Sequence, residues 1–168
     1  MNYLSPYNSP LGPMTMASDG EALIGLWFDG QKYDRSTLVG DFVVGSELPV
    51  FRQTEAWLDV YFGGGVPDFV PPLRVAGSPF WKMVADVMLS IPYGETRTYG
   101  WMAAEVARRM GRTSMSAQAV GGAVGHNAIS LIIPCHRVVG FGGSLTGYAG
   151  GLDRKRWLLD LEQCKGNL

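Results

Sequence analysis

The most reactive combination of side chains in this sequence surrounds one cysteine. Cys135 directly follows Pro134, and His136 and Arg137 come directly after it. Positive charge beside a thiol lowers its pKa from about 8.5 and increases the fraction of thiolate, which is the nucleophilic form. The pattern therefore predicts a nucleophilic cysteine. Cys164 has no such neighbours and is interpreted as a small structural residue.

The composition is that of an ordinary globular protein, with 46% hydrophobic and 17% charged residues among 168. These values exclude a disordered, collagenous or coiled-coil chain. No apolar run approaches the roughly 18 residues that span a bilayer, and the first residues have no features of a secretory signal. Two cysteines do not make a disulfide framework, so we expect a cytoplasmic protein.

Basic and acidic side chains separate along the chain. Residues 1–73 carry three basic and nine acidic side chains, whereas residues 74–168 carry eleven basic and six acidic ones. We interpret these halves as two domains, and the charge suggests that the second meets a polyanion. Chance segregation between two domains would give the same pattern, so charge alone names no partner.

The first half has the pattern of a small sheet followed by a helix. We expect strands over residues 11–17 and 22–28, joined by hairpin residues 18–20, and a further strand near 41–44. Apolar spacing predicts a helix over residues 48–62, which three glycines end. The proline-rich segment 66–79 cannot be regular helix and is predicted to link the domains.

The second half is predicted to be mostly helical. Ser78 is expected to cap one helix and Thr98 a second that runs to about residue 110. Ser116 or Ser114 can cap a third helix that ends near residue 124. The second and third helices, joined by a short glycine-containing turn, are the minimum for a helix-turn-helix.

This third helix is built from very small residues. Gly121 and Gly122 are adjacent, and each costs a helix roughly 1 kcal/mol relative to alanine. Either a partner approaches the helix backbone closely, or the helix packs tightly against another one; the sequence leaves both interpretations open. Phosphate-loop, dinucleotide-binding and paired zinc-binding motifs are absent, which disfavours nucleotide-driven and zinc-finger chemistry.

The residues around Cys135 belong to a longer pattern. It comprises Ile91–Thr96, Tyr99, Ala119–Ala123, Asn127, Pro134–Val139, Gly147–Gly151, Lys155, Trp157–Leu159 and Glu162. In these features the chain resembles the O6-alkylguanine-DNA alkyltransferases, the methylated-DNA–protein-cysteine methyltransferases. The resemblance covers nearly all of residues 78–163 and is loose in the N-terminal half.

The resemblance implies an α+β fold, with a small N-terminal α/β domain on an antiparallel sheet. A mostly helical C-terminal domain would bind the DNA minor groove through its helix-turn-helix. The implied function is DNA repair: the protein would flip O6-alkylguanine from duplex DNA and transfer the alkyl group irreversibly to Cys135, acting once. The implied partner is double-stranded DNA, with O4-alkylthymine left open as a second substrate. We expect a monomer without cofactor, metal or membrane attachment, which associates with the nucleoid when bound to DNA.

The resemblance also implies roles for single residues. His136 would remove the thiol proton through a water, Glu162 would orient that histidine, and Tyr148 would donate toward guanine N3. The implied substrate-binding residues are Asn127, which braces the cysteine loop, Val138 and Ala149, which bind the base, and Tyr99, which presses on the phosphate. The implied DNA-binding residues are Gln118, Ala119, Gly121, Gly122, Arg109, Arg112 and Arg137. Gln118 stands where the family usually has an intercalating arginine.

Three other functions remain as alternatives. A damage sensor would bind alkylated DNA without transfer, but the presence of Cys135 disfavours it. A helix-turn-helix regulator would leave the Cys135, His136 and Glu162 set without a purpose. A hydrolase that uses a Cys–His pair would lack an obvious oxyanion hole.

Overall fold

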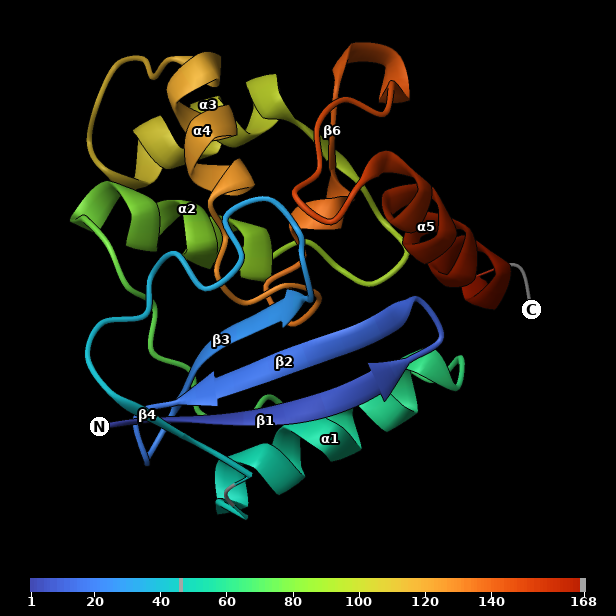
Figure 1. Cartoon of the computed structure of the whole chain (residues 1–168). Coiled ribbons are helices and arrows are strands. Elements are labelled where there is room, and N and C mark those ends of the chain that lie inside the picture. Colours follow the sequence, from blue (N-terminus) through green and yellow to red (C-terminus); the bar gives the residue numbers. More distant parts are fainter. Residues whose placement is uncertain (46, 167–168) are drawn as a thin grey trace. The chain divides into compact units, whose positions relative to one another are not determined.

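The computed structural model describes residues 1–45 and 47–166, with side chains through Gln163. The chain divides into two compact units (Figure 1). The N-terminal unit comprises Met1–Ala76 together with the short segment Ala128–Ser130, and the C-terminal unit comprises Gly77–Asn127 and the chain from Leu131 onward. The return of residues 128–130 to the N-terminal unit has no counterpart in the sequence patterns.

The N-terminal unit is built on a four-stranded sheet. The strands are β1 (Asn2–Ser9), β2 (Gly12–Ser18), β3 (Leu23–Phe28) and β4 (Phe42–Val44), in the order β3-β2-β1-β4. β1, β2 and β3 are joined by hairpins and run antiparallel, but β4 pairs with β1 in parallel. The sheet is therefore mixed rather than antiparallel throughout, because a long connection instead of a hairpin leads from β3 to β4.

Helix α1 (Pro49–Phe62) lies against one face of this sheet (Figure 1). Its apolar side buries Phe51, Trp57 and Leu58, and the sheet contributes Met14 and Leu26 to the core. The helix begins where Pro49 follows Leu48 and ends at Gly63, as the sequence predicted. The predicted strands over 11–17, 22–28 and 41–44 are also confirmed within a residue or two, whereas β1 was not predicted.

Two distant segments cover the outer edge of β3. The Leu23 amide donates to the Pro72 carbonyl at 2.7 Å, and the Leu26 amide donates to the Ala128 carbonyl at 2.8 Å. Residues 66–78 of the proline-rich segment form no helix, in agreement with their sequence. Pairing of this kind satisfies backbone groups that an open sheet edge would leave exposed.

The C-terminal unit contains α2 (Pro79–Leu89), α3 (Tyr99–Arg109), α4 (Ala117–Gly125) and α5 (Leu152–Gly166). Its short strands β5 (Arg97–Thr98) and β6 (Val138–Val139) pair in parallel, and two 3-10 turns are η1 (Cys135–Arg137) and η2 (Phe141–Gly143). Ser78, Thr98 and Ser116 cap α2, α3 and α4 through their hydroxyls, which confirms the predicted starts.

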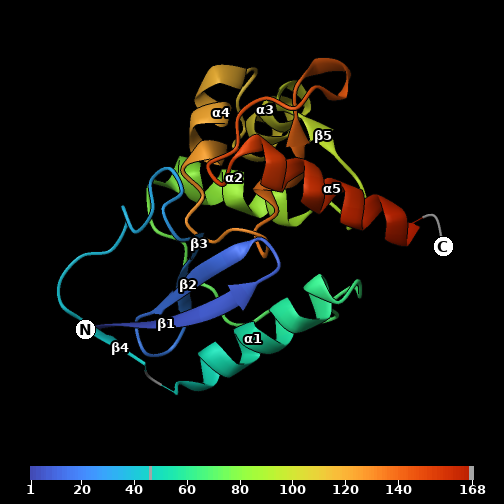
Figure 2. The same ribbon diagram turned by 45° about the vertical axis from the view of Figure 1, so that its right-hand side comes forward.

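Helices α2, α3 and α4 pack together around a small apolar core (Figure 2). Val84, Met102, Val106 and Val120 contribute fully buried side chains to it. α3, the turn after it and α4 form the predicted helix-turn-helix. No helix in the described part of the chain is long and apolar enough to span a bilayer.

Candidate active site

Cys135 opens the short turn η1 at the end of a buried apolar run. Its side chain is 5% exposed, and its amide donates to the Ile133 carbonyl at 2.8 Å. The Asn127 amide group donates to the same carbonyl at 2.8 Å. Asn127 thus holds the backbone just before the cysteine, which is the bracing role that we expected for it.

His136 and Glu162 form a fully buried pair. The Nε2 atom of His136 lies 2.5 Å from Oε2 of Glu162, and their side chains are 0% and 1% exposed. The other carboxylate oxygen, Oε1, accepts from Arg137 Nε at 2.8 Å and from the Gly94 amide at 3.0 Å. α5 therefore brings Glu162 back to residues that immediately follow the cysteine.

The pKa values within this pair indicate which group carries charge. Burial alone would raise the pKa of Glu162, but hydrogen bonds from His136 and Arg137, together with the positive charge of Arg137, outweigh it and lower the pKa to about 2. Burial lowers the pKa of His136, against the raising effect of Glu162. We infer an ionised carboxylate and a neutral imidazole with its proton on Nε2, which leaves the ring's basic lone pair on Nδ1.

The expected electrostatic activation of Cys135 by His136 and Arg137 is wrong. Burial raises the pKa of the Cys135 thiol, so the resting residue is a thiol. His136 is neutral, and the Arg137 guanidinium donates to Glu162 and, at 2.8 Å, to the Ile91 carbonyl. The opposing influences that lower the pKa come from the Asn127 hydrogen bond, the charge of Lys155 and nearby backbone amides.

Lys155 is the site residue to which the sequence reasoning gave no role. Its side chain is fully buried, and Nζ donates to the carbonyls of Val138 at 2.6 Å, Gly147 at 3.2 Å and Thr146 at 3.3 Å. Three hydrogen bonds satisfy the ammonium group, which makes its burial tolerable. A signal was available: Lys155, Leu158 and Glu162 recur at helical spacing and form the buried face of α5.

The remaining predicted base-binding residues lie around the same loop. The buried Tyr148 hydroxyl interacts with Cys135, and burial raises its pKa well above the usual value. The Tyr99 hydroxyl donates to the Thr146 carbonyl at 3.3 Å. Ala149 is half-buried. The Val138 carbonyl already accepts from Lys155, so only its second lone pair remains for a base amine.

The residues of α4 that we predicted to bind DNA are exposed or partly exposed. Gln118, Ala119 and Gly122 are exposed, and Gly121 is partly exposed. A Cβ atom on Gly122 would meet nothing within 4 Å, whereas one on Gly121 would lie 3.7 Å from the Tyr99 ring in ordinary contact. Packing inside the unit therefore does not require glycine at position 122, which favours close approach by a partner.

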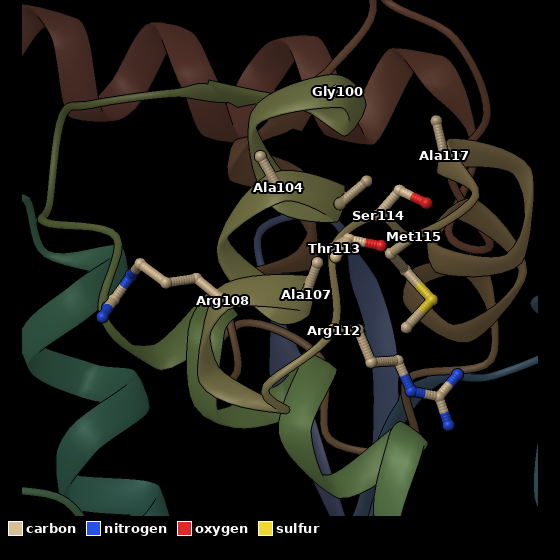
Figure 3. A pocket seen from close by; sticks show the side chains of 10 residues that line it. Gly100, Ala104, Ala107, Arg108, Arg112, Thr113, Ser114, Met115 and Ala117 are labelled. Atoms are coloured by element: carbon tan, nitrogen blue, oxygen red, sulfur yellow. The ribbon is translucent and has the colours of Figure 1, made fainter.

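The arginines at the end of α3 and in the turn after it differ in their surroundings. A groove of about 490 Å³ lies between the small residues of α3 and the turn before α4, and Arg108 and Arg112 extend from it in opposite directions (Figure 3). Arg108 and Arg109 bind Glu105, whose pKa their hydrogen bonds lower to about 2. Arg112 is exposed and forms no ion pair with any residue in the described ranges.

The structure does not bring Arg137 to the surface with these groups. The residue is 8% exposed, and its guanidinium donates internally to Glu162 and to the Ile91 carbonyl. This position argues against the expected contact between Arg137 and DNA. Among the described residues, no group of three His, Cys, Asp or Glu side chains could hold a metal ion.

Comparison with family profiles finds two adjoining matches. Residues 2–75 match the ribonuclease-like domain of 6-O-methylguanine DNA methyltransferase, and residues 79–164 match the DNA binding domain of the same family. The two matches together span most of the chain.

Full-length relatives and solved structures are also similar. A methylated-DNA–protein-cysteine methyltransferase of Mycobacterium tuberculosis is 42% identical over 158 residues, which cover 94% of this chain and 90% of the relative. One from Methanosarcina acetivorans is 42% identical over 160 residues, covering 95% and 97%. The crystal structure of Mycobacterium tuberculosis OGT in complex with DNA superposes with a TM-score of 0.82 at 39% identity, covering 97% of this chain and 94% of that one.

Proposed function

The chain belongs to the 6-O-methylguanine DNA methyltransferase family, and we propose that Cys135 is the residue on which it performs the alkyl transfer. The protein is a methylated-DNA–protein-cysteine S-methyltransferase, and alkylated duplex DNA is its partner. One observation carries the assignment of the acceptor: a thiol stands directly before a buried histidine that an ionised Glu162 holds at 2.5 Å. Cys135 is therefore the nucleophile, His136 the base, and Glu162 the acid that orients this base.

The bond changes follow from these groups. The Cys135 sulfur attacks the alkyl carbon, the new S–C bond forms, and the bond from that carbon to guanine O6 breaks. His136 Nδ1 takes the thiol proton through a water, while the negative charge of Glu162 stabilises the imidazolium that results. The leaving guanine takes up a proton in exchange, so the net reaction moves one alkyl group to sulfur and one proton to the base.

The thiolate needs a cation as it forms, because burial disfavours its charge. Lys155 supplies that cation from within the unit and holds the Val138 and Gly147 carbonyls at the same time. The Tyr148 hydroxyl stays protonated because burial raises its pKa, and it donates a hydrogen bond to N3 of the departing guanine. The Ala149 amide binds O6.

A base inside a duplex cannot reach a buried thiol, so the target nucleotide must rotate out of the helix. The small residues Ala119 and Gly122 let the backbone of α4 approach the narrow minor groove. Gln118 occupies the space that the base leaves, and Tyr99 presses on the target phosphate. Arg109 and Arg112 contact neighbouring phosphates.

The product explains why each molecule acts once. A thioether sulfur is a poor leaving group, so the alkylated cysteine is not converted back to a thiol. A sensor or regulator function is not favoured, because it would leave the cysteine and its buried partners without a role. We further propose that the protein acts as a monomer in the cytoplasm and is associated with the nucleoid when bound to DNA.

Intact mass spectrometry tests this function. After incubation with a duplex containing O6-methylguanine, the protein should gain one methyl group, about 14 Da, and peptide mapping should place it on Cys135. Cys135→Ser should abolish the gain while binding to the alkylated duplex persists. Methylation of Cys164, or repeated turnover without modification of the protein, would contradict the proposal.

A further inference from the structure

The loop between β6 and Tyr148 carries an aromatic side chain that has no role in the site described above. Phe141 is 97% exposed, more than any other large hydrophobic side chain in the described ranges. Contact with water over nearly the whole ring is unfavourable compared with burial. The loop therefore presents an apolar surface at its tip.

The backbone of this loop has a defined shape. The Gly140 amide donates to the Ser144 carbonyl at 2.8 Å, and the Gly143 amide donates to the Gly140 carbonyl at 3.0 Å. Gly142 and Gly143 have φ angles of 71° and 83°, which only glycine adopts readily. The two bonds close the loop into a tight turn, and Phe141 is the exposed large apolar side chain of this turn.

The same loop adjoins the helix-turn-helix. The Thr146 carbonyl accepts from the Tyr99 hydroxyl at 3.3 Å, and the Tyr99 ring lies against Gly121 of α4. Lys155 also donates to Thr146, at 3.3 Å, so the base of the loop is fixed to the cysteine site. Figures 1 and 2 both show the loop after β6 on the same side of the C-terminal unit as α4.

We propose that Phe141 packs its ring against the alkylated DNA strand beside the extruded nucleotide. The inference rests on the proposed function, because it needs a duplex seated on α4 and a nucleotide turned toward Cys135. Aromatic rings stack on any base and pack on sugars without sequence preference, which suits a protein whose target is a lesion. Phe141 is thus a positioning residue for duplex DNA and takes no part in the chemistry.

The test compares two substrates for Phe141→Ala. The rate of transfer from a duplex containing O6-methylguanine should fall roughly tenfold, because stacking on one base is lost. The rate with free O6-benzylguanine should not change, since the free base needs no contact outside its pocket. Phe141→Trp should retain the duplex rate. Phe69→Ala, which removes a 38% exposed phenylalanine from the N-terminal unit, is the matched control and should change neither rate.

The possible outcomes distinguish the proposed Phe141–DNA contact from the proposed alkyl transfer to Cys135. A duplex rate for Phe141→Ala within twofold of the parent would overturn the DNA contact. Equal losses with both substrates would also overturn it, because they would show that Phe141 shapes the base pocket. If the parent protein modified itself with neither substrate, the proposed function would fail first.

Discussion

The Nε2 atom of His136 lies 2.5 Å from Oε2 of Glu162, and both groups are shielded from water. Oε1 of the same carboxylate accepts from Arg137 and the Gly94 amide, so both carboxylate oxygens are held by donors. This arrangement fixes the imidazole proton on Nε2 and the basic lone pair on Nδ1. The tautomer of His136 is therefore set by a residue on α5.

Glu162→Gln should test that relationship directly. The glutamine oxygen is expected to stay with the two donors at Oε1, which places its NH2 group against His136 and drives the proton to Nδ1. Loss of the general base should slow alkyl transfer about a hundredfold or more with both duplex DNA and free O6-benzylguanine. The rates are measured by quenching the reaction at different times and determining the alkylated fraction of the protein by intact mass spectrometry. An unchanged rate would mean that His136 does not act as the base.

Acid sensitivity should follow from the same carboxylate. The pKa of Glu162 is lowered to about 2 in the folded protein, from its ordinary value of 4.5. Stability from its ionised form is therefore present above about pH 4.5 and is lost as the pH falls toward 2. Urea unfolding between pH 6 and 3 should show a steeper decline for the parent than for Glu162→Gln. Parallel curves would show that Glu162 contributes nothing to the acid transition.

The residues of this site differ in how far the sequence predicts them. Cys135 and His136 are adjacent in the sequence and follow an apolar run, so the local sequence pattern is enough to predict them as site residues. Lys155 and Glu162 lie on the buried face of α5, and between Leu152 and Gln163 two of the three fully buried residues are charged. A search for an apolar helix face therefore misses α5, because charged residues that serve the site occupy buried positions where a helix usually has apolar residues.

In the fold, too, the features set by neighbouring residues are predicted from the sequence, whereas those set by distant segments are not. Capping serines and threonines, prolines and glycines predicted α1 to α4 because each acts within a few residues. The parallel pairing of β4 with β1 and the pairing of residues 128–130 with β3 depend on distant partners. A local sequence pattern cannot predict which distant segment a strand pairs with.

Gly122→Ala should separate stability from DNA binding. The added Cβ meets no atom within 4 Å, so the free energy of unfolding should rise by up to roughly 1 kcal/mol through better helix propensity. Affinity for duplex DNA should fall, because the methyl group holds the α4 backbone away from the groove. Urea unfolding and fluorescence anisotropy measure the two quantities. A more stable variant with unchanged affinity would place Gly122 outside the interface.

Arg112→Ala and Arg109→Ala should weaken DNA binding unequally. Arg112 is exposed and forms no ion pair among the described residues, whereas Arg109 shares Glu105 with Arg108. Loss of Arg112 should reduce the slope of log affinity against log salt by about one, with equal effects on damaged and undamaged duplex. Arg109→Ala should reduce it less. Identical slopes for Arg112→Ala and the parent would remove Arg112 from the phosphate contacts.

Gln118→Arg should reveal what this position does during base extrusion. Gln118 is exposed on the first turn of α4, where a side chain can enter the duplex in place of the flipped base. An arginine there adds a charge attracted to DNA and donors for the unpaired cytosine, so extrusion becomes more favourable. Transfer from duplex O6-methylguanine should therefore accelerate more than transfer from free O6-benzylguanine, which needs no extrusion. Single-turnover rates with the two substrates at matched salt measure the difference. Equal acceleration would place Gln118 outside the flipping step, and an accelerated duplex rate that vanishes at high salt would assign the gain to phosphate attraction alone.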